Sequence, residues 1–354
     1  MYKKLFIPGP THVRDEILQA QTAPMLGHRD SLYSDLQRAT TEKLQEVLYT
    51  KQRVFIFTSS GSGAMEASIR NCVGKKCLNT VCGAFSKRMR KITEANGKDN
   101  GVIEVPMGQA ITAEMVDKEL ATGQYDAVTF VHNETSTAVM HDLEAYSEVM
   151  KKYPDVISIV DAVSSMAGAK IEVDKLGLDI VLAGTQKCFA LPPGLAICAV
   201  SDRAMEKAKT VPNRGTYFDF WDMESKYGKS QTPSTPGVSL IQALNKQLDD
   251  ILEEGLENRW ARHKEMAAFI QDWARKYWAI YSDENYLSTT VSTITNTRGV
   301  SIKDLNTELG KRGAMISNGY GTLKEKCFRI AHMGDITLDD LKWLTAQIED
   351  ILGL

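Results

Sequence analysis

The sequence predicts an α/β fold, in which a mostly parallel sheet is covered by helices on both faces and a smaller unit follows it. From about residue 54, short apolar runs alternate with helical segments. Strands that are apolar along their whole length are typical of parallel sheets buried between helices. The chain also has 354 residues, a length that suits a large domain followed by a smaller one.

Five apolar runs predict the strands of the large sheet, and a helix is predicted over 63–71, directly after the first run. The runs cover 54–58, 126–132, 156–161, 179–184 and 195–200. Each is short and bounded by polar or glycine-rich residues, as buried strands are. We therefore expect consecutive strands to be joined by helices that cover the sheet.

The segment 201–237 differs from the rest, because it is rich in polar residues and carries Pro233 and Pro236 close together. It predicts a long loop, which is usually functional in a compact domain. Beyond it the pattern is helical over 238–277, followed by strands at 291–295 and 326–331 and a helix at 338–352. We expect an N-terminal arm over 1–15, a large domain over 16–255 and a small α+β domain over 256–354.

Composition excludes several functional classes. Hydrophobic residues make up 43% and charged residues 25%, with a net charge of -3, so no basic surplus indicates nucleic acid. No apolar run approaches the about 18 residues that would span a membrane, and the start lacks the long apolar stretch of a signal peptide. The six cysteines form no CxxC pair, which indicates no metal site and favours reduced, buried thiols. We expect a cytoplasmic protein.

Candidate functional residues gather at strand ends, because ligands of open parallel sheets bind beyond the carboxyl ends of the strands. Ser59 to Gly63 follows the first strand and opens a helix. Small residues at a helix N-terminus favour an anion such as phosphate. The loop is not a P-loop, since no Gly-Lys-Ser/Thr follows, and Gly61-x-Gly63 supports a dinucleotide site only weakly.

An acid and a lysine follow two further strands of the same sheet. Asp161 ends one run and Lys187 follows the next, so both are expected at the edge that carries the anion loop. Pyridoxal phosphate (PLP) needs a lysine for its aldehyde, a carboxylate for its pyridine nitrogen and a cradle for its phosphate. The pattern therefore predicts PLP as cofactor, with Lys187 forming a Schiff base and later moving a proton.

A series of motifs runs along nearly the whole chain. They are Pro8-Gly9-Pro10-Thr11, Gly27-His28-Arg29, Ser60-Gly61-Ser62, Gly83-Ala84-Phe85-Ser86-Lys87-Arg88, Val131-His132-Asn133-Glu134-Thr135-Ser136-Thr137, Asp161-Ala162-Val163, Gly184-Thr185-Gln186-Lys187, Thr235-Pro236-Gly237 and Phe328-Arg329-Ile330. With them the chain resembles the class V aminotransferases of PLP fold type I, most closely those that act between alanine or serine and glyoxylate or pyruvate. The resemblance implies a mixed, mostly parallel seven-stranded sheet and a homodimer.

The resemblance also implies a role for each matching residue. Lys187 matches the Schiff-base lysine and Asp161 the partner of the pyridine nitrogen, while Thr135 matches a contact to the ring hydroxyl. The two ring faces correspond to Phe85 and Val163. The phosphate contacts correspond to Ser60, Gly61, Ser62 and Gln186, and to Thr232 and Thr235 reaching in from the neighbouring subunit.

Arg329 matches the arginine that holds the substrate α-carboxylate, which a guanidinium binds bidentately. His28 and Arg29 lie in a segment that relatives fold over the site. A second cation there would read a side-chain carboxylate or a phosphonate. Alternatively, Arg29 pairs with Asp30 or Asp35 and never meets substrate. Arg88 and Arg214 are further candidates for a second cation, which the sequence does not rank.

The implied reaction is transfer of an amino group from alanine or serine to glyoxylate or pyruvate by a ping-pong mechanism. Class V aspartate and 2-aminoethylphosphonate aminotransferases are the alternatives. A cysteine desulfurase would need a mobile reactive cysteine, but Cys327 lies in an apolar strand pattern and Cys188 follows the lysine too closely. A PLP-fold subunit without turnover and an NAD-binding oxidoreductase are further readings of the sequence.

Overall fold

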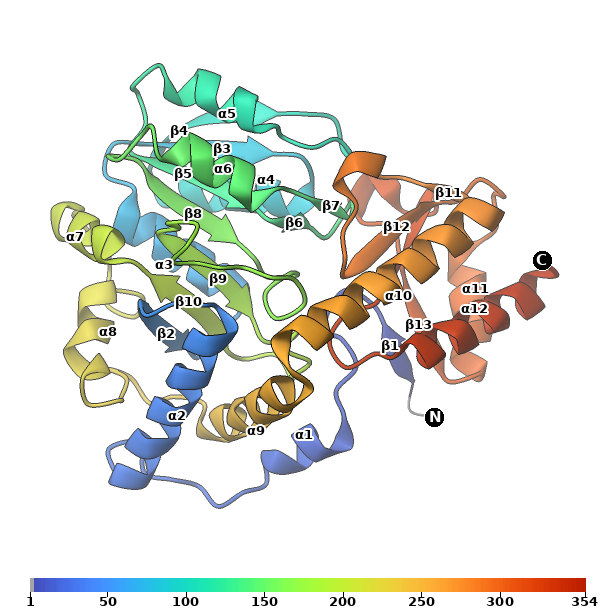
Figure 1. The fold of residues 1–354 in the computed structure, drawn as a ribbon, viewed down its shortest axis with the longest axis horizontal. Coiled ribbons are helices and arrows are strands. Elements are labelled where there is room, and N and C mark those ends of the chain that lie inside the picture. Colours follow the sequence, from blue (N-terminus) through green and yellow to red (C-terminus); the bar gives the residue numbers. More distant parts are fainter. Residues whose placement is uncertain (1–2) are drawn as a thin grey trace.

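The computed structural model describes residues 3–354, so Met1 and Tyr2 of the predicted N-terminal arm lie outside the described residues. The chain forms two layered units side by side, with a large sheet in one and a smaller sheet in the other (Figure 1). Both described ends of the chain lie beside the smaller unit.

The large sheet has seven strands in the order β2-β10-β9-β8-β5-β3-β4. Their bounds are β2 (Arg53–Phe57), β3 (Lys76–Val81), β4 (Asp99–Glu104), β5 (Ala127–Val131), β8 (Ile157–Asp161), β9 (Ile180–Gly184) and β10 (Ala196–Val200). β10 is antiparallel to both of its neighbours, and the other pairs are parallel. The prediction of a mixed, mostly parallel seven-stranded sheet is confirmed.

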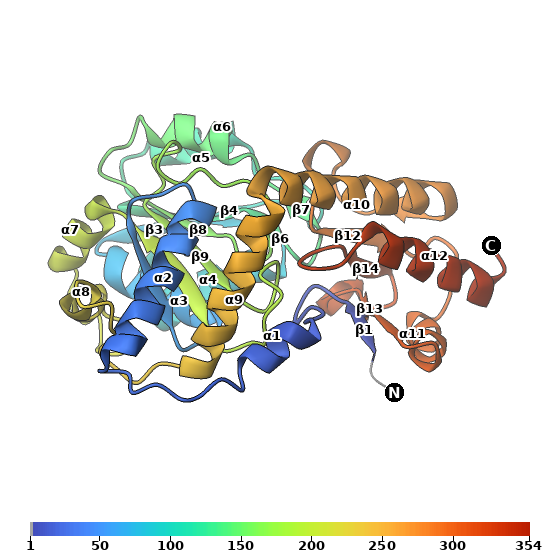
Figure 2. The same ribbon diagram turned by 60° about the horizontal axis from the view of Figure 1, so that its bottom comes forward.

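Alternate residues of each strand face opposite sides of the sheet, so both faces are apolar and each is covered by a layer of helices. On one side pack α2 (Ser31–Val47), α5 (Ala113–Leu120), α6 (Leu143–Met150) and α9 (Val238–Glu254). On the other side pack α3 (Gly61–Cys72), α4 (Ala84–Ala95), α7 (Asp202–Thr210) and α8 (Phe220–Tyr227). Figure 2 shows α2 and α9 lying across the near face of the sheet.

The five predicted strands are present, but β3 and β4 were not predicted. β4 lies at the edge and keeps most of its side chains partly exposed, so it lacks an apolar run. β3 buries the polar residue Asn79, whose side chain accepts from the hydroxyls of Thr93 and Thr129. Asn79 interrupts the apolar run by which a buried strand is recognised, and the fold tolerates it there because its side chain is hydrogen-bonded.

The prediction of one long loop over 201–237 is wrong, because α7 and α8 lie within it. Ser201 caps α7 by accepting from Ala204 N, and Asp219 caps α8 by accepting from Trp221 N. Both helices are short, so a few residues carry each apolar face. What remains after α8 is the segment 228–237 before α9.

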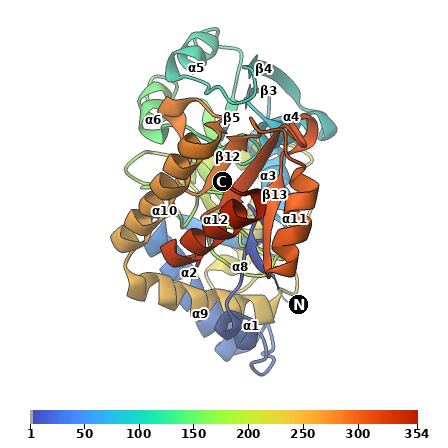
Figure 3. The same ribbon diagram turned by 90° about the vertical axis from the view of Figure 1, so that its right-hand side faces the viewer.

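The smaller unit contains a five-stranded sheet in the order β1-β13-β14-β12-β11. Its strands are β1 (Lys4–Phe6), β11 (Ala279–Ile280), β12 (Val291–Thr295), β13 (Ala314–Asn318) and β14 (Cys327–Ala331). Around it lie α10 (Leu256–Tyr277), α11 (Ile302–Lys311) and α12 (Leu338–Leu352) (Figure 3). The predicted strands at 291–295 and 326–331 and the helix at 338–352 are confirmed.

Two details refine the predicted domains, whose boundaries stay a prediction. β1 pairs with β13 in a parallel register, so Lys4–Phe6 of the expected arm belongs to the C-terminal sheet. The helix expected over 238–277 is divided at Gly255, which adopts a φ of +81° that favours glycine. Short elements outside both sheets are α1 (Asp15–Ala20), β6 (Asn133–Glu134) and β7 (Val139–Met140). Among residues 3–354, no helix is long and apolar enough to cross a bilayer.

Candidate active site

Asp161 and Lys187 lie at the same edge of the large sheet. Asp161 is the last residue of β8, and Lys187 follows the end of β9 by three residues. The two strands are parallel neighbours, with Asp161 in register with Leu182. Their carboxyl ends therefore face the same side, as the sequence predicted.

The Lys187 side chain is buried, with 7% of its surface exposed. Burial, assisted by the positive charge of Arg329, lowers the pKa of the amine to about 8. Its Nζ donates to the carbonyl oxygen of Pro8. Gly9 adopts a φ of +117°, and a Cβ there would lie 2.6 Å from Lys187 Cδ. The N-terminal segment thus packs directly against the lysine, and only glycine fits.

Asp161 is also buried, at 3% exposure. Burial is the main cause that raises the pKa of its carboxyl group to about 7. Its Oδ1 accepts from the backbone N–H of Val163 at 2.9 Å. Because a buried carboxylate is costly without a cation, this position is suited to a partner that carries positive charge.

The predicted anion loop lies where α3 begins, at Gly61. Ser60 stands at the N-cap but its side chain makes no capping hydrogen bond, which leaves the first backbone N–H groups of the helix available to a ligand. A Cβ at Gly61 would lie 2.8 Å from Val163 Cγ2, so the loop packs closely on the turn after Asp161. The buried Oε1 of Gln186 has no hydrogen-bond partner among the described residues.

Phe85 stands in the first turn of α4, and its ring centroid is 5.6 Å from Lys187 Nζ. The fully buried carboxylate of Glu134 accepts from the backbone N–H groups of Phe85 and Ser86 and from the Ser136 hydroxyl at 2.6 Å. A Cβ at Gly83 would lie 2.5 Å from Glu134 Cδ. Glu134 therefore fixes the start of α4, although the sequence analysis assigned it no role.

Arg329 lies in the middle of β14 with 6% exposure. Its guanidinium donates to the carbonyl oxygen of Thr135 at 3.1 Å and to that of Asn318 at 3.3 Å. Among residues 3–354 it forms no salt bridge, and burial lowers its pKa to about 10. The Thr135 hydroxyl donates to Ser164 Oγ at 2.8 Å. The fold thus brings a buried cation without a salt bridge, among the described residues, from the small unit to the large one.

The Arg29 guanidinium donates to the carbonyl oxygens of Thr232 and Pro233 at 2.7 and 2.9 Å. It does not pair with Asp30, which caps α2, or with Asp35, which pairs with Arg38. The preceding residue, His28, is partly exposed. Arg29 therefore holds the segment before α9 in place.

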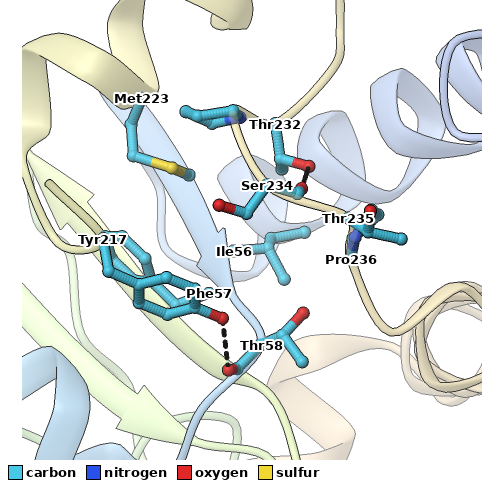
Figure 4. A pocket seen from close by; sticks show the side chains of 10 residues that line it. Ile56, Phe57, Thr58, Tyr217, Met223, Thr232, Ser234, Thr235 and Pro236 are labelled. Carbon is cyan, nitrogen blue, oxygen red and sulfur yellow. Dashed lines mark hydrogen bonds between the residues drawn. The ribbon is translucent and has the colours of Figure 1, made fainter.

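Thr232 and Thr235 line a small hollow on the large unit (Figure 4). The Thr232 hydroxyl donates to Ser234 O at 2.7 Å, and the Tyr217 hydroxyl donates to Thr58 O at 3.1 Å. The other lining residues come from the end of β2 with Thr58 after it, from α8 with Tyr217 before it, and from the segment 232–236, and Lys187, Asp161 and Gln186 are not among them. The hollow that the two threonines line therefore does not include the lysine.

The two unranked arginines have different surroundings. Arg214 is paired with Asp219 at 2.8 Å and donates to carbonyl oxygens at the end of α7. Arg88 reaches the candidate site, since its Nη1 lies 3.5 Å from Ser62 Oγ and its guanidinium carbon lies 4.9 Å from the Phe85 ring centroid.

All six cysteines are buried and none forms a disulfide. Burial raises the pKa of the Cys188 thiol to about 12 and that of Cys327 to about 11. Both thiols stay protonated at neutral pH, which argues against a desulfurase cysteine. Within residues 3–354, no three His, Cys, Asp or Glu side chains are grouped so that they could hold a metal ion.

Comparison with known proteins identifies the family. The class-V aminotransferase model matches residues 15–335. An uncharacterized aminotransferase of Methanocaldococcus jannaschii is 39% identical over 94% of this chain and 88% of the relative. The L-aspartate–glyoxylate aminotransferase of Paracoccus denitrificans is 34% identical over 94% and 87%. The crystal structure of an alanine–glyoxylate aminotransferase from Nostoc sp. superposes with a TM-score of 0.93 at 27% identity, over 99% and 96%. The chain is therefore an aminotransferase of the class-V family, with the α/β architecture of PLP fold type I.

Proposed function

We propose that this enzyme uses PLP to move an amino group from a small amino acid, alanine or serine, to glyoxylate or pyruvate. The observation that supports this most is the placement of a buried amine, Lys187, and a buried carboxyl group, Asp161, at one sheet edge, where the charge of Arg329 acts on the amine. An amine with a lowered pKa, an acid and a carboxylate-binding cation are the groups that transamination requires.

The residues present fit PLP. The side-chain amide of Gln186, whose NH2 group would donate to a phosphate oxygen, would form a cradle for a phosphate group together with the uncapped start of α3 and the glycine at 61. Lys187 Nζ would bond the aldehyde, Asp161 would face the ring nitrogen, and Thr135 the ring hydroxyl. Phe85 and Val163 would cover the two ring faces. When bound, PLP supplies an electron sink that stabilises negative charge on the substrate α-carbon.

The chain's own groups then bind the substrate and move protons. Arg329 binds the donor α-carboxylate with its forked N–H groups and so fixes the direction of the Cα–H bond. Lys187 Nζ, whose pKa is about 8, is neutral often enough near pH 7 to accept the α-proton and return it. Asp161 is ionised when a cation lies against it, because opposite charge lowers a carboxyl pKa.

The donor side chain decides between related substrates. The Nostoc structure, similar over nearly the whole chain, supports small donors. Aspartate is the second candidate, supported by similarity to the Paracoccus enzyme; 2-aminoethylphosphonate is a further alternative. Reading of an acidic side chain by His28 or Arg29 remains a proposal. If Arg29 binds the side-chain carboxylate of aspartate, Arg29→Ala impairs aspartate turnover more than alanine turnover. Equal losses for the two donors would fit a role in holding Thr232 and Pro233 in place.

We also propose that the enzyme acts in the cytoplasm as a homodimer in which each subunit completes the other's site. Supporting this, Thr232 and Thr235 line a hollow of the single chain that does not include Lys187, while the resemblance assigns them to a neighbour's phosphate. A mixed dimer of Lys187→Ala and Thr235→Val subunits then contains one site with neither substitution. Its recovery of activity, above that of either parent, supports sharing.

The test of the function is spectroscopic. The purified protein is expected to be yellow with bound PLP and to bleach when alanine, serine or aspartate is added. Colour returns with glyoxylate or pyruvate. Lys187→Ala is expected to lose the band of the covalently bound cofactor, and Lys170→Ala, an exposed lysine paired with Glu257, is the matched control. A protein that stays yellow but bleaches with no donor would be a non-catalytic subunit.

A further inference from the structure

A phosphate dianion in the proposed site lacks an assigned cation. The side chains that the family resemblance matches to the phosphate are serines, threonines and a glutamine, all of them neutral. The start of α3 supplies about half a positive charge through its backbone dipole. A partly buried dianion is stabilised far more by a charged donor than by neutral ones. The site therefore calls for a further positive group next to Ser60–Ser62.

Arg88 reaches this loop from the neighbouring helix. It lies three residues after Phe85 on α4, so the two side chains share one helix face. Its guanidinium carbon is 4.9 Å from the Phe85 ring centroid, and its Nη1 is 3.5 Å from Ser62 Oγ in the first turn of α3. Arg88 thus contacts both Phe85, which is expected to cover the cofactor ring, and the loop that is expected to bind its phosphate.

The charge of Arg88 is not used elsewhere in the described chain. Its exposure is intermediate, yet no carboxylate lies within ion-pair distance of it among residues 3–354. Three other cations on α3 and α4 are paired: Arg70 with Glu66, Lys87 with Glu104 and Arg90 with Glu94. The charge also reaches the reactive pair, since Arg88 is among the groups that lower the pKa of Asp161 and of Lys187.

We propose that Arg88 is the cationic ligand of the cofactor phosphate, donating from its guanidinium to a phosphate oxygen beside Ser62 while packing against Phe85. The inference rests on the proposed PLP-dependent function and adds the charged contact that the neutral set lacks. Lysine at this position would keep the charge but lose the forked geometry and the stacking on the ring.

The experiment compares PLP with pyridoxal, which lacks the phosphate. The full-length enzyme, stripped of cofactor, is titrated with each compound, and Kd is taken from the absorbance change. Arg88→Gln is expected to weaken PLP binding by about 10- to 100-fold, the loss expected for one charge-assisted hydrogen bond. Pyridoxal binding is expected to change by less than about threefold, and Arg88→Lys to fall between wild type and Arg88→Gln for PLP.

Arg90→Gln is the matched control, because Arg90 lies on the same helix and pairs only with the partly exposed Glu94. It is expected to leave both affinities unchanged. Urea unfolding of all three variants separates a binding effect from loss of fold. Equal losses for PLP and pyridoxal, or no loss for PLP, would overturn the proposal.

Two further results separate this proposal from its alternatives. If wild-type enzyme binds PLP and bleaches with donors while Arg88→Gln keeps full PLP affinity, the function stands and the inference fails. If Arg88→Gln keeps PLP affinity but loses turnover of aspartate and not of alanine, Arg88 reads a substrate side chain instead. Wild-type protein that binds no PLP would overturn both the function and the inference.

Discussion

Burial sets the protonation of the two central side chains. Asp161 and Lys187 are 3% and 7% exposed, and removing each from water disfavours its charged form. The pKa of the acid therefore rises to about 7 while that of the amine falls to about 8. A cationic group bound against Asp161 would lower the pKa of its carboxyl group again, so the protonation of Asp161 depends on what occupies the site.

The cofactor-free protein is expected to lose stability as pH rises because of Asp161. Its pKa is about 7 in the folded chain against an ordinary 3.8, so between these values the folded state holds a proton that the unfolded state has lost. The contribution is full below about pH 4 and is lost as pH rises through 7, by up to roughly 4 kcal/mol. Urea unfolding across this range should show it, and Asp161→Asn should flatten the curve. Parallel curves for the two proteins would contradict the assignment.

Arg329→Lys is expected to lower kcat/KM by a similar factor, about 10- to 100-fold, for alanine, serine and aspartate. All three donors share the α-carboxylate that the guanidinium fork is proposed to bind, and a lysine offers no fork. Steady-state kinetics with each donor measure the effect. Arg298→Lys, which changes an exposed arginine bonded to Tyr277 O, is the control. A loss confined to one donor would show that Arg329 reads the side chain.

At the scale of elements, the start of α4 depends on one buried acid from β6. The Glu134 carboxylate accepts from two N–H groups of the first turn and from Ser136, which satisfies donors that a helix leaves unpaired. Gly83 is needed because any side chain there would meet Glu134. The hydrogen bonds of Glu134 to the start of α4 therefore fix the position of Phe85 next to Lys187.

Glu134→Gln is expected to lower the free energy of unfolding by about 1–3 kcal/mol. One amide oxygen replaces two acceptor oxygens, and the amide NH2 faces backbone donors that then lack a partner. Urea unfolding measures the change, and Glu94→Gln at the exposed end of α4 should change it little. Glutamine as stable as glutamate at 134 would mean that the cap contributes nothing.

Short elements show why pattern alone predicts only part of the fold. β5, β8, β9 and β10 are buried along their whole length, so their apolar runs identify them. β13 was missed because it has no continuous buried run: Met315 is exposed between the buried residues Ala314 and Ile316. α7 and α8 were missed because their caps, Ser201 and Asp219, also occur in ordinary turns.

At the scale of the whole molecule, Arg259 joins both units to the candidate site. This fully buried side chain donates to Cys188 O at 2.8 Å and to Ala167 O at 2.9 Å, on the turns that follow Lys187 and Asp161. It also pairs with Glu254 at 2.8 Å and lies 3.5 Å from Asp335. The beginning of α10 is thereby tied to the loops that carry the lysine and the acid.

Arg259→Met is expected to cost about 2–5 kcal/mol of stability, because it leaves the buried carbonyl oxygens of Ala167 and Cys188 without their donor, at about 1–3 kcal/mol each, although Glu254 keeps its ion pair with Arg262. Arg275→Met removes an arginine whose partners Asp272 and Glu284 are exposed and should cost about 0–1 kcal/mol. Denaturant unfolding of both variants makes the comparison. If both variants lost a similarly small amount of stability, the apolar packing of methionine would be able to replace the hydrogen bonds and ion pairs of Arg259.

The residue pattern alone predicts the α/β class, the buried strands and the placement of Asp161 and Lys187 at one sheet edge. These follow from local apolar runs and from the rule that parallel strands end on the same side. The surroundings of these two residues depend on contacts that form when the chain folds. The tertiary structure placed β1 in the C-terminal sheet, Arg29 on the carbonyls of residues 232 and 233, and Arg88 beside Ser62. Such contacts join residues far apart in the chain, and no local pattern specifies them, because long polar side chains choose partners only after the fold has formed.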